Sequence, residues 1–200
     1  MLQTAALILA AGKGTRMHSD KPKVLQTVLG EPMLRYVLEA VRPVFDGRVL
    51  VVVGHQAGMV EAAFPEASFV HQEQQLGTGH ELMQAMPALE GQCERVLVVN
   101  GDTPLLSEDV VRHFVEASEG ADLAFATIEL DDPAAYGRVV RAADGSVRAI
   151  VEAKDYDPAL YGPEPHEVNA GMYCVRLDLA ARLLPRIGNA NKSGEYYITD

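Results

Sequence analysis

The chain has 200 residues, a formal net charge of -11 and a pI near 4.9, and 48% of its residues are apolar. This length and apolar share suit one globular α/β domain and exclude a disordered chain, while the acidic balance argues against a nucleic-acid partner. No signal peptide precedes the first apolar run, and no run reaches the roughly 18 residues of a membrane span, so we expect a cytoplasmic protein without a membrane partner.

The first predicted element is a buried strand over residues 5–10, because its apolar run is continuous and stops at glycine. Gly12 and Gly14 follow directly, and glycines at a strand end let backbone amides approach an anion closely. The spacing fits neither a Walker loop nor a dinucleotide fingerprint, because only Lys13 separates the glycines and position 17 is Met17. A solvated turn remains the alternative, but a local excess of cations in an acidic chain favours a bound polyphosphate: Lys13, Arg16, Lys21 and Lys23.

Strands and helices then alternate up to about residue 130. A helix is predicted to start at Glu31-Pro32, with Pro32 at its first position. Ser107 is the predicted cap of a later helix, whose core face would be Val110, Val111, Phe114 and Val115. Further helices are expected over residues 57–64 and 82–89, and further strands over residues 48–53, 68–71, 95–99 and 122–130. This alternation predicts an α/β fold with a mostly parallel central sheet and helices on both faces.

The pattern changes after residue 130. Apolar runs over residues 138–141 and 147–151 flank a turn that contains Gly145, which predicts an antiparallel hairpin. A strand over residues 167–175 and a helix over 178–187 follow, and the proline-rich stretch 155–166 is predicted to be an irregular loop. We therefore expect one structural domain with a nucleotide-binding part (1–130) and a small antiparallel part (131–200) that receives a second substrate.

Three polar loops directly follow predicted strands, at Gly12–Gly14, Gln72–Gly77 and Asn100–Asp102. Ligands of open parallel sheets gather outside the carboxyl ends of the strands, so these loops are expected to converge. Asp102 is the best candidate metal ligand, because Mg²⁺ on a phosphate needs few protein carboxylates; an Asx-turn residue is the alternative. The cysteines, Cys93 and Cys174, form neither a disulfide framework nor a zinc site, and no nucleophilic triad occurs.

Longer motifs resemble those of the sugar-nucleotide pyrophosphorylases, and most closely the uridyltransferase half of the bacterial bifunctional N-acetylglucosamine-1-phosphate uridyltransferase family. The resemblance spans nearly the whole chain. The most specific motifs are Gln-Leu-Gly-Thr-Gly-His at 75–80 and Gly-Glu-Tyr-Tyr-Ile-Thr-Asp at 194–200. The others are Leu9–Met17, Pro22-Lys23, Gly101-Asp102, Tyr136–Arg138, Ile150–Asp155 and Glu167–Gly171.

The resemblance implies a Rossmann-like nucleotide-diphospho-sugar transferase fold and a role for each motif. Residues of the uridine site would be Leu9, Ala10, Ala11, Gly12, Gln72, Gly77 and Thr78, with Asn100 and Gly101 beside the ribose. Arg16 and Lys23 would neutralise the triphosphate and the departing pyrophosphate, and Asp102 would bind Mg²⁺. The amino sugar would be held by Gly137, Glu152 and Asn169.

The implied reaction makes UDP-N-acetylglucosamine and pyrophosphate from UTP and N-acetylglucosamine 1-phosphate, for cell-wall precursor synthesis. It proceeds by Mg²⁺-assisted in-line attack on the α-phosphorus, and the full-length protein is expected to be a homotrimer. The chain departs from the family pattern at Thr103 and Ala170, and it ends at Asp200. The family's later metal-binding Asn and acetyltransferase β-helix lie beyond that position, so we expect this chain to be a fragment.

Two other functions remain open. A nucleotidyltransferase that uses CTP, GTP or dTTP with another sugar phosphate would share the opening motif, and Gln72 with residues 75–79 discriminates against it. A non-catalytic module would bind UDP-sugar without releasing pyrophosphate, although Arg16, Lys23 and Asp102 argue for catalysis.

Overall fold

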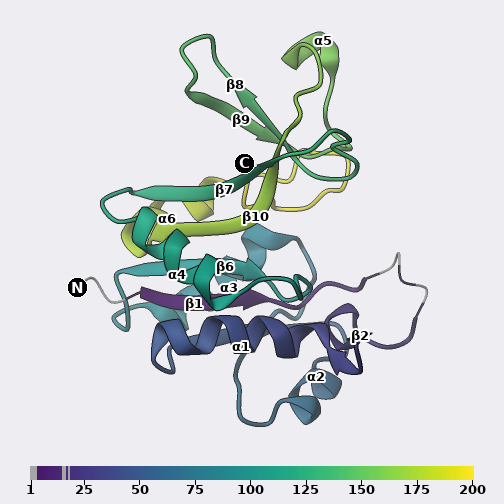
Figure 1. Cartoon of the computed structure of the whole chain (residues 1–200), viewed down its shortest axis with the longest axis vertical. Helices are drawn as coiled ribbons and strands as arrows, with labels where there is room; N and C mark the ends of the chain where they lie inside the picture. Colours follow the sequence, from purple (N-terminus) through teal and green to yellow (C-terminus); the bar gives the residue numbers. More distant parts are fainter. Residues whose placement is uncertain (1–3, 15–16, 18) are drawn as a thin grey trace.

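The computed structural model of the chain describes residues 4–14, 17 and 19–200. In this part of the chain an eight-stranded sheet has the order β5-β4-β1-β6-β10-β8-β9, with β7 paired to β10 (Figure 1). The strands are β1 (Thr4–Leu9), β4 (Val49–Val53), β5 (Ser68–His71), β6 (Arg95–Asn100), β7 (Leu123–Glu129), β8 (Arg138–Arg141), β9 (Val147–Val151) and β10 (Glu167–Arg176).

The first half of the sheet is parallel. β1 pairs with β4 on one side and with β6 on the other, so that Leu7 lies opposite both Leu50 and Val98, and β4 pairs with β5. Both faces of β1 are buried, which explains why its sequence is continuously apolar instead of alternating.

Helices cover both faces of this parallel half, as predicted. Ala6 and Ile8 of β1 belong to a core shared with α1 (Met33–Phe45), α2 (Ala57–Ala63) and α4 (Glu108–Ala117). Leu7 and Leu9 belong to a second core shared with α3 (Thr78–Leu89) and α6 (Leu177–Leu183). Successive side chains of a strand point to opposite faces, so one short strand supports both layers.

The second half of the sheet is antiparallel and is organised by β10. Cys174 of β10 lies opposite Leu97 of β6 and Ala124 of β7, while Val168 lies opposite Arg138 of β8. The β8–β9 hairpin and α5 (Pro158–Tyr161) form one end of the molecule, and α1 and α2 lie at the other (Figure 1). A single sheet therefore continues across residue 130.

The predicted start of the first helix is wrong. Glu31 and Pro32 form β3, which pairs with β2 (Thr27–Val28), and α1 starts at Met33. Pro32 has ψ 142°, so it is extended and lies just before the helix instead of inside it. The turn between β2 and β3 has positive φ at Leu29 and Gly30, the geometry of a type I′ hairpin turn, and leucine there gives only a weak sequence signal.

Three later differences are smaller. Ser107 caps α4 by accepting a hydrogen bond from the Val110 amide, as predicted, but the Val110 side chain is 49% exposed and does not belong to the core. The helix expected over 178–187 is split into α6 and a 3-10 turn, η3 (Leu184–Arg186), which contains Pro185. The predicted loop 155–166 contains α5, capped by Asp157. None of the helices in the described part of the chain is long and apolar enough to span a bilayer.

Candidate functional site

The loop after β1 is fixed from both neighbouring strands. The Gly101 amide donates to the Leu9 carbonyl at 2.8 Å, and the Ala10 amide donates to the Val52 carbonyl at 2.9 Å. A Cβ atom at position 101 would lie 3.1 Å from the Leu9 carbonyl oxygen, which is closer than a side chain normally packs. Gly101 therefore lets the loop after β6 lie directly against the loop after β1, as the predicted convergence requires.

Lys23 connects the glycine loop to Asp102. It is the first residue of the 3-10 turn η2 (Lys23–Leu25), and its ammonium group forms an ion pair with the Asp102 carboxylate. Gly14 has φ +58°, and a Cβ atom there would lie 2.7 Å from the Lys23 Cβ. The glycine, the lysine and the acid thus form one small cluster at the carboxyl end of β1 and β6, with Lys23 42% exposed and accessible to an anion.

Gln72 is buried at the end of β5, with 1% of its surface exposed. Its side-chain amide nitrogen donates to the Gly77 carbonyl at 3.2 Å and to Nδ1 of His80 at 2.9 Å. These two contacts use both hydrogens of the amide, so Oε1 is the atom with which Gln72 can contact a ligand, and it is an acceptor.

The last residues of the chain pack against the loop that begins α3. The Gly79 amide donates to the Tyr196 carbonyl at 2.8 Å, and the Tyr196 amide donates to the Leu76 carbonyl at 2.7 Å. A Cβ atom at Gly77 would lie 2.6 Å from the Tyr196 oxygen, and Gly77 has φ +107°. The two most specific sequence motifs therefore form one structural unit, in which glycine is required by backbone contact.

Gly137, Glu152 and Asn169 lie together in the antiparallel half. The Asn169 amide donates to the Gly137 carbonyl at 2.8 Å, and a Cβ atom at Gly137 would lie 3.4 Å from Oε1 of Glu152. Burial raises the pKa of Glu152, although a hydrogen bond from Thr199 opposes this shift. The Asn169 side chain donates to the Tyr173 hydroxyl at 2.5 Å, and burial raises the pKa of Tyr173 to about 12.

Gly171 joins this group to the loop after β6. It has φ +73°, and a Cβ atom there would lie 2.5 Å from the Asn100 side-chain nitrogen. The pairing of β10 with β7 shifts register between Asn169 and Tyr173, which is where Gly171 lies. At this irregularity Asn100, which belongs to the predicted nucleotide-binding part, lies beside the residues predicted to hold the sugar.

A family model described as the MobA-like NTP transferase domain matches residues 6–161 of the chain. The chain belongs to this family. It is 64% identical over 200 residues to "Bifunctional protein GlmU" of Nitratidesulfovibrio vulgaris (strain DP4), and 46% identical over 200 residues to the protein of that name from Lawsonia intracellularis (strain PHE/MN1-00). Each alignment covers 98% of this chain and 44% of the relative, so the chain spans less than half the length of these proteins. The resemblance to the bifunctional enzymes is thereby confirmed.

Solved structures show the same fold at low identity. HddC from Yersinia pseudotuberculosis has a TM-score of 0.73 at 23% identity, over 100% of this chain and 84% of that one. A UDP-glucose pyrophosphorylase complexed with UDP-glucose has a TM-score of 0.74 at 20% identity, over 100% of this chain and 85% of that one. The expected nucleotide-diphospho-sugar transferase fold is confirmed.

In this NTP transferase domain the candidate metal ligand is the carboxylate of Asp102, which pairs with Lys23. No group of three or more His, Cys, Asp or Glu side chains able to hold a metal ion occurs among the described residues. A metal held by protein ligands alone therefore does not fit, whereas one carboxylate at Asp102 fits a cation whose other ligands are phosphate oxygens and water. Arg16, the other predicted catalytic cation, lies outside the described residues.

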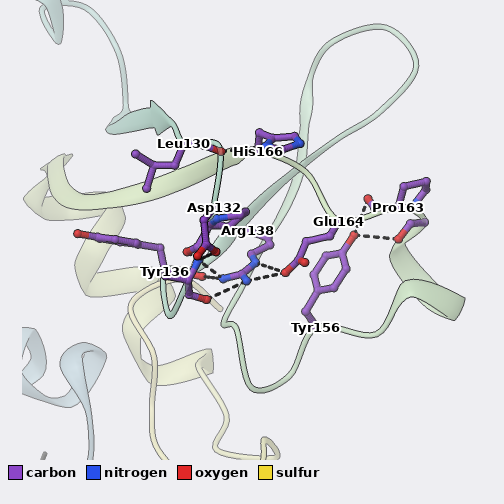
Figure 2. Close-up of polar contacts among 11 residues, drawn as sticks. Leu130, Asp132, Tyr136, Arg138, Tyr156, Pro163, Glu164 and His166 are labelled. Atoms are coloured by element: carbon purple, nitrogen blue, oxygen red, sulfur yellow. Dashed lines mark hydrogen bonds and ion pairs between the residues drawn. The ribbon is translucent and has the colours of Figure 1, made fainter.

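Sequence reasoning missed Arg138 as a structural residue of the site. Arg138 is 5% exposed, and its guanidinium donates to the Ala134 carbonyl at 2.9 Å. It also donates to Glu164 at 2.7 Å and to the Tyr136 carbonyl (Figure 2). These contacts fix the loop that leads into Gly137. The signal in the sequence was its place in the Tyr-Gly-Arg motif, but its acidic partner is 26 residues away in a loop without periodicity.

Proposed function

We propose that this chain is the uridyltransferase domain that converts UTP and N-acetylglucosamine 1-phosphate into UDP-N-acetylglucosamine and pyrophosphate. The observation that carries the proposal is the junction of two clusters. Lys23 packs against Gly14 and pairs with Asp102, and Asn100 at the end of β6 lies against Gly171, beside Gly137 and Asn169. A triphosphate at the first cluster would thus meet a sugar phosphate held at the second.

The proposed reaction joins two negatively charged phosphates, so it depends on nearby positive charge. An oxygen of the sugar 1-phosphate attacks the α-phosphorus in line, a new oxygen–phosphorus bond forms, and the bond to the oxygen that bridges to the β-phosphorus breaks. Pyrophosphate leaves with that electron pair, and no general base is required because the attacking phosphate is already ionised. Lys23 and Arg16 lower the repulsion between the two polyanions and stabilise the leaving group.

Asp102 is the residue that would hold Mg²⁺, shared with the triphosphate. When bound there, the cation would supply positive charge that offsets the charge of the departing pyrophosphate. In this proposal nucleotide binding would draw Lys23 from Asp102 to the phosphates, which would leave the Asp102 carboxylate available to the cation.

The hydrogen bonds of Gln72 favour uracil over cytosine as the base of the bound nucleotide. With both amide hydrogens donated inside the protein, its Oε1 offers an acceptor. Uracil carries a hydrogen on N3 that matches this acceptor, whereas neutral cytosine carries a lone pair there. The homotrimer and the role in cell-wall precursor synthesis stay predictions drawn from the family, and the cytoplasmic location stays a prediction drawn from the apolar runs of the sequence.

The test is pyrophosphate release in the presence of Mg²⁺, with each of UTP, CTP, GTP and dTTP and with N-acetylglucosamine 1-phosphate, glucose 1-phosphate or no acceptor. We expect release only with UTP and the N-acetylated sugar, and its loss in Asp102→Asn. Release with another nucleotide contradicts the uridyltransferase assignment. Binding of UDP-N-acetylglucosamine without release under any condition identifies a non-catalytic module instead.

A further inference from the structure

Glu81 is a buried acid that the proposed reaction does not use. It lies in the first turn of α3 with 6% of its surface exposed, and its backbone amide donates to the Gly77 carbonyl at 3.0 Å. Its carboxyl group accepts a hydrogen bond from the backbone amide of Ala11 at 3.4 Å. The contact therefore joins the start of α3 to the loop after β1, across 70 residues of sequence.

The Ala11 peptide is held at both ends. Its amide donates to Glu81, and its carbonyl accepts from the His55 amide at 3.3 Å. The Ala11 side chain is fully buried, whereas the next two residues, Gly12 and Lys13, are exposed. The hydrogen-bonded backbone of Ala11 therefore directly precedes Gly12 and Lys13, the exposed residues that could contact an anion.

The surroundings of Glu81 favour its neutral form. Burial raises its pKa to about 8, and the nearby carboxylates of Asp102 and Glu195 act in the same direction, while the amides of Ala11 and Ala10 oppose it. A neutral carboxylic acid keeps an acceptor oxygen for the Ala11 amide without placing a third negative charge beside the predicted phosphate site. The Glu81 carboxyl group therefore acts as a neutral hydrogen-bond acceptor and not as a member of an ion pair.

We propose that Glu81 is a positioning residue of the nucleotide subsite, whose buried carboxyl group fixes the backbone of Ala11 and thereby orients the loop from Gly12 to Gly14. The inference rests on the proposed function, because it concerns the subsite that function assigns to the nucleotide. Glu81 acts through the loop and not on the reacting atoms.

The test compares Glu81→Gln, which keeps an acceptor oxygen, with Glu81→Met, which fills similar volume without one. The matched control is Met83→Ala, a partly buried position on the same helix that packs in the same core. We expect Glu81→Met to raise the UTP dissociation constant by roughly three- to tenfold, the value of one lost hydrogen bond, and Glu81→Gln to restore it to within about twofold. Calorimetric titration with UTP and Mg²⁺, without acceptor, measures both, and Met83→Ala should leave UTP affinity unchanged.

Amide hydrogen exchange of Ala11 in the unliganded protein tests the contact without any variant. We expect the Ala11 amide to be protected in the unmodified chain and in Glu81→Gln, and to exchange faster in Glu81→Met. An unprotected Ala11 amide in the unmodified chain, or wild-type UTP affinity in Glu81→Met, overturns the inference, as does an equal loss in Met83→Ala. If the unmodified chain binds no nucleoside triphosphate, the proposed function fails first and this inference fails with it.

Discussion

Lys23 and Asp102 form an ion pair in the structure, and the proposed binding of a triphosphate would break it. Surface ion pairs of this kind contribute about 1 kcal/mol or less to stability, because solvent screens them. In the proposed reaction the same lysine would lie beside the departing pyrophosphate, where the loss of one electrostatic contact lowers turnover by about 10²–10³.

We therefore expect Lys23→Met to lower kcat by roughly two orders of magnitude while changing the free energy of unfolding by about 1 kcal/mol or less. The control is Arg112→Met, which removes the same charge and an ion pair with Glu108 on α4. Pyrophosphate release and urea denaturation of both variants give the comparison. Retained turnover in Lys23→Met, or an equal loss in Arg112→Met, removes Lys23 from the proposed mechanism.

The raised pKa of Glu81 predicts how the stability of the folded chain depends on pH. Burial raises that pKa from 4.5 to about 8, so the folded chain holds a proton there that the unfolded chain releases. The resulting stabilisation is fully present below about pH 4.5 and is lost as pH rises through about 8. Glu81→Gln cannot titrate, while Asp102 and Glu195, which face the group, remain in both proteins. The Tm of the unmodified chain should fall relative to that of Glu81→Gln across this range, and parallel Tm curves would contradict the burial argument.

At the scale of elements, the loop before β8 is held by a clamp of backbone carbonyls around one side chain. Arg138 is 5% exposed and donates to the carbonyls of Ala134 and Tyr136, while the side chain of its acidic partner Glu164 is 48% exposed (Figure 2). The exposed ion pair is screened, whereas carbonyls left without a donor carry a desolvation cost. The clamp should therefore depend on the carbonyl bonds more than on the ion pair.

This difference is measurable with two variants. We expect Arg138→Met to lower the free energy of unfolding by about 1–3 kcal/mol and to raise KM for the sugar phosphate, because Gly137 follows the clamped loop. Glu164→Gln should change stability by about 1 kcal/mol or less and leave that KM unchanged. Urea midpoints and steady-state kinetics distinguish the variants. If Glu164→Gln costs as much as Arg138→Met, the ion pair is the dominant contact and the clamp interpretation is wrong.

The same elements show what the sequence can predict. Continuous apolar runs identified β1 and β4, an N-cap serine identified α4, and a turn glycine identified the β8–β9 hairpin, because these signals are local. The strand at Glu31–Pro32 was missed because its pairing depends on a turn with positive φ at Leu29. The Arg138 clamp and the contact between Gly77 and Tyr196 were missed because their partners are distant in the sequence, and no spacing rule connects them.

At the scale of the whole molecule, the division near residue 130 separates predicted roles but not packing units. β7 lies before that point and pairs with β10, and β10 also pairs with β6, so both parts share one sheet. The core under β1 includes Leu82 and Val98 from the first part and Tyr173 and Leu177 from the second. Which strand lies beside β6 could not be predicted locally, since antiparallel insertion of β10 is decided by tertiary packing.

We therefore expect the two parts to unfold together, in a single transition. Hydrogen exchange as a function of urea should show that amides of β1 and of the central part of β10 lose protection at the same concentration, because neither strand can leave without exposing the shared core. The β8–β9 hairpin is an internal control: Val147 and Arg148 at its outer end are exposed, so its protection should be lost at lower urea. If β10 loses protection at a lower urea concentration than β1, residues 131–200 unfold as an independent unit. The two parts would then differ in stability as well as in predicted role.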